Sequence, residues 1–360
     1  MFKDLKVIEL ASVLAGPSVG LFFAELGAEV IKIEPPSGDV TRSWKLANED
    51  PNDDRSSYFS SVNWGKKSIL LDLKNNTNLE RLYQMVKQAD IVITSYKPGD
   101  AKKLGVCYDC LKKYNDQIIV GEITGYGENT NRVGYDAIIQ AEAGFMSMNG
   151  QPGGAPTKMP VALMDILTAH QLKEGLLCAL LHKEKSGQGS LVKTSLIQSG
   201  IASLANQATN YLKANIIPGQ MGSEHPNIVP YGTVFKTKDK KHILLAVGTD
   251  KQFSTLCNIL DISLEKGLFE TNLQRVENRQ KLIPVLEKAI LKEDSSVLIS
   301  ALHQVQIPAG IIKNIKDVFD SEYGQKQLFE YENLKGLRSI AFEAKFIDKQ
   351  SLKPPSHLNK

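Results

Sequence analysis

Asp165 is the acidic residue whose surroundings most need a chemical explanation. It lies in a largely apolar segment, residues 159–169, and directly precedes a helix-like run over residues 166–185. Burial of an unpaired charge is strongly unfavourable, so the carboxylate is expected to have either a hydrogen-bonding partner or a functional role. One interpretation is a helix N-cap, in which the carboxylate accepts hydrogen bonds from the N–H groups of Leu167 or Thr168. The other is a nucleophile held at a helix N-terminus. The two roles are compatible, and the residues alone leave the choice open.

The six histidines form no recognisable catalytic or metal-binding pattern. No two of them have the i,i+4 spacing of a helical zinc site, and no serine lies in a G-x-S-x-G motif. His182 and His242 are most simply solvated side chains. His225 lies in a segment rich in glycine and proline, where a turn role and a functional role both stay open.

The cysteines also argue against a metal centre. Cys107 and Cys110 fit a C-x-x-C pair, but zinc needs two further ligands, and Cys178 and Cys257 are isolated. A redox pair of the thioredoxin type requires a strand-to-helix junction, whereas this pair lies in a short helix-like segment, residues 104–114. We therefore interpret the four cysteines as incidental and predict no metal site.

The turn after the first predicted strand lacks the glycines of a nicotinamide-binding loop. Residues 11–16 contain one glycine where G-x-G-x-x-G has three, although Glu34 lies at a strand end where a ribose-binding acid is expected. A helix N-terminus at Gly16 and Pro17 still suits an anionic or adenine-bearing ligand. The sequence thus argues against nicotinamide chemistry.

Charge and hydropathy exclude two further classes of function. The 43 basic and 40 acidic residues give a net charge of +3, too small for a nucleic-acid surface. No apolar run approaches the roughly 18 residues of a membrane span, and the N-terminus has no signal-peptide core. We expect a cytoplasmic protein without nucleic-acid or membrane partners.

The elements that must position Asp165 alternate between short apolar runs and amphipathic runs, which is typical of a parallel α/β layer. The predicted strands are residues 6–10, 29–34, 68–73, 90–94, 117–123 and 190–195. The predicted helices are residues 16–27, 78–88, 135–148, 166–185 and 196–213. The fold class is therefore α/β, with a Rossmann-like parallel sheet.

A length of 360 residues favours more than one domain. We predict a large Rossmann-like domain over residues 1–217 and a linker over residues 218–230, where glycine, proline, serine and asparagine are frequent. A smaller α+β domain follows over residues 231–317. The polar, weakly patterned segment 318–360 is expected to return to the large domain.

Several short stretches, in order along the chain, resemble the family III CoA-transferases. They are residues 10–17, 26–34, 38–42, 63–68, 96–99, 124–127, 134–137, Asp165 and 185–189. Residues 206–212 and 222–239 are most similar to the succinyl-CoA:glutarate, or dicarboxylate, subgroup. The resemblance covers nearly the whole chain.

The resemblance implies an enzyme that moves CoA from an acyl-CoA to a free carboxylic acid, with no tightly bound cofactor and with coenzyme A and acyl-CoA as substrates. Asp165 would be the catalytic nucleophile, passing through an aspartyl anhydride and an aspartyl-CoA thioester. The CoA-binding residues it implies are Val13, Leu14, Arg42, Ser95, Tyr96 and Lys97. The substrate-binding residues it implies are Tyr58, Tyr135, Arg132 and His225.

Three alternatives are compatible with the same scaffold. An α-methylacyl-CoA racemase has a histidine where this chain has Tyr135, and a phenol, with an ordinary pKa of about 10, is a poor base near neutral pH. A carnitine-type CoA-transferase matches residues 206–239 less well. A catalytically silent CoA-binding subunit would not need Asp165.

The resemblance also implies a homodimer in which two ring-shaped chains pass through one another. Two departures from the family pattern affect this expectation and the site. The glycine-rich acceptor loop is reduced to residues 247–250, and the chain ends at Lys360, where relatives continue into a final helix.

Overall fold

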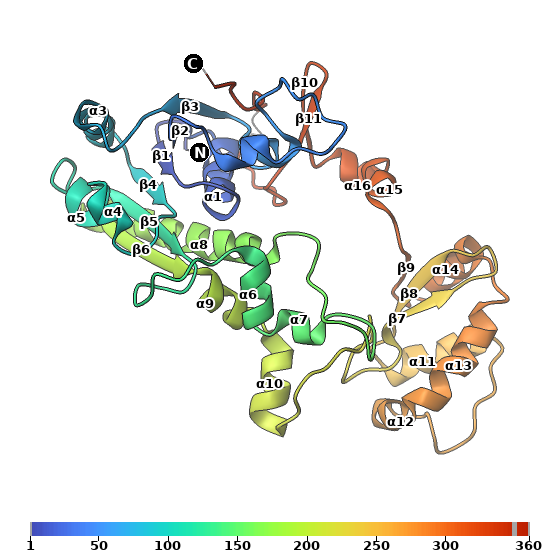
Figure 1. The fold of residues 1–360 in the computed structure, drawn as a ribbon. Coiled ribbons are helices and arrows are strands. Elements are labelled where there is room, and N and C mark those ends of the chain that lie inside the picture. Colours follow the sequence, from blue (N-terminus) through green and yellow to red (C-terminus); the bar gives the residue numbers. More distant parts are fainter. Residues whose placement is uncertain (1, 348–350, 359–360) are drawn as a thin grey trace. The chain divides into compact units, whose positions relative to one another are not determined.

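The protein is described by a computed structural model that covers residues 2–347 and 351–358. The chain forms two compact units (Figure 1). The large unit consists of Met1–Phe145, Lys158–Ile216 and Gln325–Lys360, and the small unit consists of Met146–Thr157 and Ile217–Gly324. Within the described residues, no helix combines the length and the apolar character that a membrane span requires.

A six-stranded parallel sheet forms the centre of the large unit, which confirms the predicted α/β class. The strand order is β3-β2-β1-β4-β5-β6. The strands are β1 Lys6–Leu10, β2 Glu29–Glu34, β3 Lys66–Leu70, β4 Ile91–Thr94, β5 Ile119–Thr124 and β6 Ser190–Ser195. Val7 of β1 pairs with Val30 on one side and with Ile91 on the other, so the order reverses between β1 and β4. Ligands of such sheets bind at the carboxyl ends of the strands at this reversal.

Helices cover both faces of the sheet, which explains why its central strands β1, β4 and β5 are almost entirely buried. On one face, Val19 and Phe23 of α1 (Ala15–Glu25) pack with Leu172 and Leu176 of α8 (Leu163–Ser186). The other face is covered by α3 Asn76–Val86, α4 Asp100–Lys103 and α5 Tyr108–Leu111. The remaining helices of this part of the chain are η1 Val40–Ser43, α2 Ser57–Ser60, α6 Asp136–Glu142, α7 Phe145–Met148, α9 Leu196–Ala202 and α10 Ala205–Ala214.

The small unit has its own core between a three-stranded antiparallel sheet and a group of helices. Phe235, Ile243, Leu256 and Leu286 are among its buried residues. Its strands, in the order β7-β8-β9, are β7 Tyr231–Lys236, β8 His242–Ala246 and β9 Ala309–Ile311. Its helices include α11 Asp250–Ile259, α12 Asn272–Glu277, α13 Arg279–Ile290, α14 Ser295–Gln304 and α15 Ile315–Phe319, and α16 Glu322–Gln325 follows.

The unit boundaries differ from the predicted ones in three places. Residues 318–324, predicted to return to the large domain, belong to the small unit. Residues 146–157, predicted to belong to the large domain, are part of the small unit. They are held there by hydrogen bonds from Gly222 N to Gly150 O at 2.8 Å and from Gln220 Nε2 to Asn149 O at 3.0 Å. The predicted linker 218–230 is consequently a packed part of the small unit.

The cysteine prediction needs a correction. The sulfurs of Cys107 and Cys110 are bonded to each other, whereas we interpreted the cysteines as incidental. Cys107 is the N-cap residue of α5 and Cys110 lies within the helix, on the face of the sheet opposite α1 and α8. Cys178 and Cys257 are free.

A buried ionic network joins the strands to the loops at their carboxyl ends. Lys32 Nζ lies 3.0 Å from Glu9 Oε1 and 3.0 Å from Asp39 Oδ2, and it donates to Ala11 O at 2.8 Å. Lys66 Nζ lies 2.8 Å from Glu9 Oε2 and donates to Pro17 O at 2.7 Å. One carboxylate, Glu9, therefore compensates two buried lysines from neighbouring strands.

Replacement of this shared carboxylate tests how strongly the network supports the fold. Glu9→Gln leaves Lys32 and Lys66 buried with one fewer counter-charge, so we expect unfolding to become easier by about 3 kcal/mol in chemical denaturation of the large unit. The matched control is Glu29→Gln, because Glu29 pairs with Lys67 at the surface, where such a pair contributes less than about 1 kcal/mol. Equal unfolding midpoints for the two variants would contradict this account.

Candidate active site

A pocket of about 190 Å³ opens at the carboxyl ends of β1, β4 and β5, at the reversal of strand order. The loops after β1 and β4, the segment before α6, and the first turn of α8 supply its walls. It brings together most of the residues predicted for the site: Val13, Leu14, Ser95, Tyr96, Lys97, Arg132, Tyr135 and Asp165. Residues more than 150 positions apart in the sequence thus share one cavity.

Asp165 lies within the first turn of α8 and is not its N-cap. The helix begins at Leu163 after Ala162, so Asp165 is the third helical residue, and the cap interpretation is wrong. Asp136 of α6 takes the capping role, since its Oδ1 accepts a hydrogen bond from Met164 N at 2.7 Å. In the described chain the Asp165 carboxylate itself has no hydrogen bond or ion pair, although the residue is only 7% exposed.

The environment makes Asp165 much more basic than an ordinary aspartate. Burial, and then the negative charge of Asp136, raise the pKa of Asp165 to about 7. A carboxylate perturbed in this way and placed in a cavity is typical of catalytic sites. Near neutral pH the group is divided between its acid and its anionic forms.

Two tyrosines differ in their relation to this carboxylate. Tyr135 is the N-cap residue of α6, is exposed, and lines the pocket. Tyr58 is not among the lining residues, but burial and the charges of Asp165, Asp136 and Asp39 raise its pKa to about 12. Its phenol therefore stays protonated and can act only as a neutral hydrogen-bonding group near neutral pH.

The loop after β1 is held in a strained conformation at the pocket wall. Val13 has φ of +71°, a left-handed conformation that β-branched residues rarely adopt. Val13 N donates to Asp39 Oδ2 at 3.3 Å, and Ser12 N donates to Ser95 Oγ at 3.2 Å. Because Lys32 fixes Asp39, the buried network described above imposes this geometry on the pocket wall.

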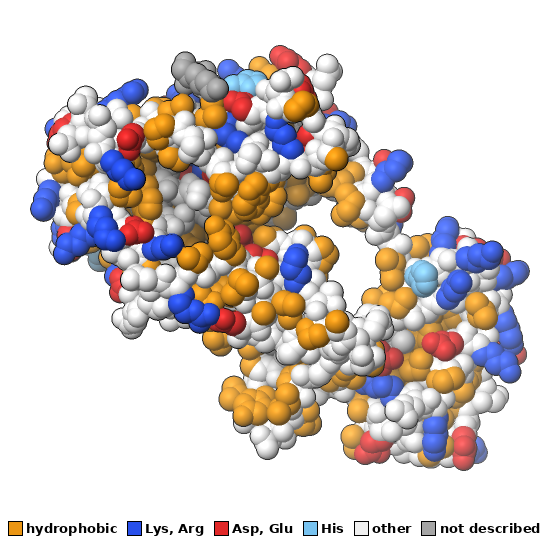
Figure 2. Space-filling model, viewed as in Figure 1, with side chains coloured by type: hydrophobic (Ala, Val, Ile, Leu, Met, Phe, Trp, Pro, Cys, Tyr) orange, Lys and Arg blue, Asp and Glu red, His pale blue; other side chains and the backbone are white. Residues whose placement is uncertain are grey.

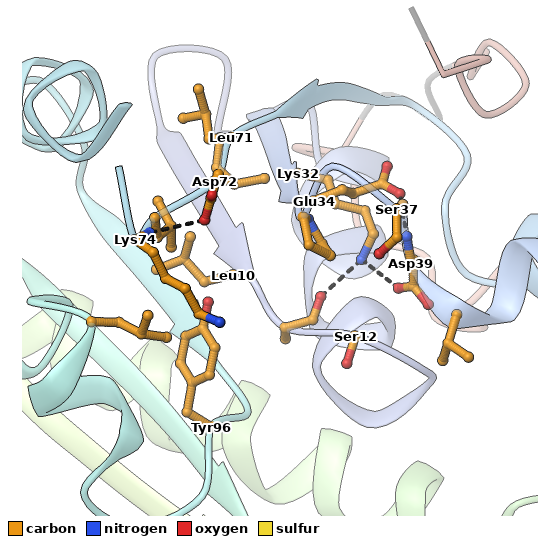
Figure 3. A pocket seen from close by; sticks show the side chains of 17 residues that line it. Leu10, Ser12, Lys32, Glu34, Ser37, Asp39, Leu71, Asp72, Lys74 and Tyr96 are labelled. Atoms are coloured by element: carbon orange, nitrogen blue, oxygen red, sulfur yellow. Dashed lines mark hydrogen bonds and ion pairs between the residues drawn. The ribbon is translucent and has the colours of Figure 1, made fainter. Parts of the chain in front are cut away.

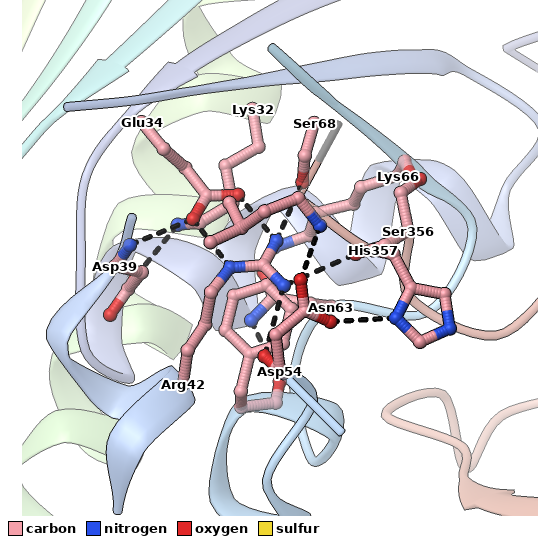
Figure 4. Close-up of polar contacts among 12 residues, drawn as sticks. Lys32, Glu34, Asp39, Arg42, Asp54, Asn63, Lys66, Ser68, Ser356 and His357 are labelled. Carbon is pink, nitrogen blue, oxygen red and sulfur yellow. Dashed lines mark hydrogen bonds and ion pairs between the residues drawn. The ribbon is translucent and has the colours of Figure 1, made fainter. Parts of the chain in front are cut away.

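Arg42 does not line the pocket, which corrects the prediction that it faces a CoA phosphate. Its guanidinium is buried and binds Glu34 through two contacts of 2.7 Å (Figure 4). It also donates to Asp54 O and Ser356 O at 3.2 Å and stacks over Phe59. With these partners the guanidinium is a structural group that ties the C-terminal segment to the sheet.

A second pocket, of about 390 Å³, adjoins the first and was missed by the sequence analysis (Figure 3). The two cavities share Ser12 and Tyr96. Its walls are mainly the apolar residues Leu10, Ala11, Ile33, Pro35, Val40, Leu71, Leu73, Tyr96 and Leu104, with Lys74 among its polar ones. The usable signal was the run Leu71-Asp72-Leu73-Lys74, which covers the end of the predicted strand 68–73 and places a cation directly after it.

Arg132 and His225, two of the substrate-binding residues that the resemblance implies, lie in different units. Arg132 lines the Asp165 pocket, where it stacks over Tyr126 at 4.2 Å and pairs with Glu142 at 2.6 Å. His225 belongs to the small unit and does not line this pocket. Its Nδ1 accepts from Asn227 N at 3.1 Å, and burial together with nearby Arg279 lowers its pKa.

One cluster among the described residues has the composition of a metal site. The ligand atoms of Asp53, Asp54 and His357 lie within 4.8 Å of one another. These side chains already have partners within the protein: His357 contacts Asp54 at 2.7 Å, and Arg55 contacts Asp53 at 2.9 Å. The cluster lines neither of the two pockets described above.

Comparisons with known proteins agree on one family. The profile of CoA-transferase family III matches residues 2–350. The chain is 38% identical over 326 residues to the succinate–glutarate CoA-transferase of Agrobacterium fabrum, covering 88% of this chain and 81% of the relative. It is 34% identical to human succinyl-CoA:glutarate CoA-transferase, covering 88% of this chain and 73% of the relative.

A solved structure of a CAIB/BAIF family protein from Brucella suis has the same fold, with a TM-score of 0.84 and 35% identity over 99% of this chain and 94% of that chain. The pocket that gathers the predicted residues around a buried, basic carboxylate is thus found on the scaffold of a known transferase family. The chain belongs to CoA-transferase family III and is a CoA-transferase, which confirms the resemblance drawn from the sequence.

Proposed function

We propose that this enzyme transfers CoA from succinyl-CoA to a short free dicarboxylic acid, with Asp165 as a covalent nucleophile. The observation that carries the proposal is a buried carboxylate without a partner in the described chain, raised in pKa to about 7, in a pocket lined by the implied CoA-binding residues. The names of the two curated relatives support the choice of donor and acceptor.

The proposed reaction needs no external acid, base or oxidant. An oxygen of ionised Asp165 attacks the thioester carbonyl carbon, the C–S bond breaks, and CoA leaves as a thiolate. The thiolate then attacks the Asp165 carbonyl carbon of the mixed anhydride and releases the donor acid as a carboxylate, leaving an aspartyl-CoA thioester. An acceptor carboxylate repeats the two steps in reverse, so one exchange is divided into easier acyl transfers.

The environment of Asp165 suits both halves of this series of reaction steps. A more basic carboxylate is a better nucleophile, and a pKa near the working pH leaves a useful fraction ionised. Burial of the side chain limits access of water to the anhydride and thioester. The protonated Tyr58 phenol is a candidate hydrogen-bond donor to the oxygen on which negative charge develops.

The two adjoining pockets suit the two ends of a CoA molecule. We place the pantetheine arm beside Val13, Ser95 and Tyr96 in the pocket of Asp165. The larger, mainly apolar pocket would hold the adenine-bearing end, with Lys74 and exposed Lys97 as phosphate partners. Tyr96 lines both cavities and would lie where the two ends of the ligand meet.

The path of the chain supports a dimer. It leaves the large unit after Phe145 and returns at Lys158, then leaves again after Ile216 and returns at Gln325, so the small unit is formed by two excursions from the large one. Apolar side chains also gather over and after α10, where Leu212 and Ile217 are 77% and 81% exposed (Figure 2). An apolar surface of this kind is typical of an interface. We propose an interlocked homodimer.

Removal of the nucleophile should abolish exchange without unfolding the protein. Asp165→Asn keeps the shape of the side chain but cannot form the anhydride, so we expect succinyl-CoA:glutarate exchange to fall by about a thousandfold or more. The measurement is transfer of labelled CoA between the two acids. Exchange above a few per cent of the wild-type rate would contradict the assignment of Asp165 as the nucleophile.

The same variant provides its own folding control. A carboxyl group with a folded pKa of about 7 stabilises the fold below its unfolded pKa and loses that contribution as pH rises through 7. Asp165→Asn should therefore be more stable than wild type at pH 8 and equally stable near pH 4. CoA binding by the variant should be retained in calorimetry.

The acceptor preference depends on a cation for the second carboxylate. Arg132→Leu should raise the KM for glutarate about tenfold or more while changing the KM for a monocarboxylate such as butyrate little. Arg279→Leu, in the small unit, is the matched control for loss of a paired arginine. Better turnover with butyrate than with glutarate by the wild-type enzyme would count against a dicarboxylate acceptor.

The dimer is tested by dilution. Interlocked chains cannot separate without unfolding, so light scattering and sedimentation should give a folded dimer at every concentration measured. Denaturant should convert the dimer directly to unfolded chains. A folded species with the 39.7 kDa mass of one chain would refute the arrangement.

A further inference from the structure

Asp136 connects α6 to the segment that carries the nucleophile. Its Oδ1 accepts from Met164 N at 2.7 Å, one residue before Asp165, and its Oδ2 accepts from Gln140 Nε2 at 2.8 Å. Gln140 is fully buried, and its Oε1 accepts from Met159 N at 2.8 Å. The Asp136–Gln140 pair therefore fixes both the approach to α8 and its first turn.

Asp136 is next to the nucleophile segment but is not one of the residues that line the pocket, whereas Tyr135 and Asp165 are. In the described chain Asp136 has no ion-pair partner. Its carboxylate accepts hydrogen bonds from Met164 N and Gln140 Nε2, and the residue is partly exposed. Two carboxylates therefore lie near the start of α8, and only Asp165 lines the pocket.

Other charged groups around α8 have partners of their own or act more weakly on Asp165. After burial, Asp136 is the named charge that raises the pKa of Asp165. The titratable groups on the surrounding elements are Glu142 on α6, Glu25 on α1, Glu122 on β5, Lys193 on β6, Tyr58 on α2, and Lys97, Arg132 and Tyr135 at the pocket. Glu142 pairs with Arg132, and Lys193 pairs with Glu128.

We propose that Asp136 is a positioning residue that holds the first turn of α8 and keeps the free nucleophile at a higher energy than its covalent forms. This inference rests on the proposed role of Asp165. The ionised Asp165 carboxylate is repelled by Asp136, but the aspartyl anhydride and the aspartyl-CoA thioester carry no charge at that position. Formation of either covalent form relieves the repulsion, which favours attack on the incoming thioester.

A set of matched variants separates the charge of Asp136 from its shape. Asp136→Asn removes the charge and keeps an oxygen that can accept from Met164 N. Asp136→Glu keeps the charge but changes the geometry, and Asp136→Ser is a second uncharged variant with a hydroxyl acceptor. Asp116→Asn removes one negative charge from an exposed residue before β5 and serves as the control.

The primary readout is the titration of Asp165 itself, followed by carbon NMR of the aspartate carboxyls and assigned with Asp165→Asn. We expect Asp136→Asn, and Asp136→Ser if the former does not fold, to lower the Asp165 titration midpoint by about one pH unit. The acid limb of the pH profile of kcat should move by the same amount, and kcat on the alkaline side should fall severalfold. Asp136→Glu should lower kcat without moving either midpoint.

The outcomes distinguish this inference from the proposed function. Wild-type midpoints in folded Asp136→Asn or Asp136→Ser would overturn the role of Asp136, whatever the activity of Asp165→Asn. Equal shifts in Asp116→Asn would also overturn it, because a general charge effect would then be sufficient. High activity of Asp165→Asn would instead remove the proposed nucleophile, and the NMR titration would still report on the two carboxylates.

Discussion

Lys32 is a buried cation that links strands β1 and β2 to the loops that form the pocket wall. Its ammonium lies between Glu9 of the neighbouring strand and Asp39 of the following loop and also binds Ala11 O. Burial alone lowers the pKa of Lys32, but the charges of Glu9 and Asp39 raise it above its ordinary value. The ion pairs therefore keep this residue charged in the interior, and Asp39 in turn accepts from the strained Val13. The wall of the nucleophile pocket depends on that chain of contacts.

Two of the groups of buried charge in the large unit differ in whether their charges have partners. The network of Glu9, Lys32 and Lys66 is compensated on every side and supports the fold. The Asp165 carboxylate is buried without a positively charged or hydrogen-bonding partner in the described chain, and a second carboxylate, Asp136, lies nearby. The first arrangement stabilises the native state, whereas the second destabilises the ionised native state and makes one carboxylate reactive. A rigid, fully paired scaffold is what allows the fold to tolerate an unpaired acid at its functional site.

The parts of the structure that depend on local patterning were predictable from the sequence. The bounds of β1, β2 and β6 are as predicted, because a short run with apolar and β-branched residues between turn-forming segments marks a strand. The start of α8 was misplaced because the residue that caps it, Asp136, lies 28 positions upstream of Met164. Arg42 was misassigned for a similar reason. A basic residue in a family motif looks like a phosphate ligand until Glu34 and the carbonyls of Asp54 and Ser356 are seen around it. The second pocket was missed because its walls come from five separate parts of the chain, namely residues 10–12, 32–40, 71–74, 96 and 104.

The most direct test of the central claim is to trap the covalent enzyme. The protein is incubated with succinyl-CoA in the absence of an acceptor, treated with hydroxylamine, digested, and mapped by mass spectrometry. The account predicts a hydroxamate at Asp165, formed from the aspartyl-CoA thioester or the anhydride. It predicts no hydroxamate in enzyme that was incubated without acyl-CoA. An unmodified Asp165 in enzyme that is catalytically active, or a hydroxamate confined to another residue, would contradict it.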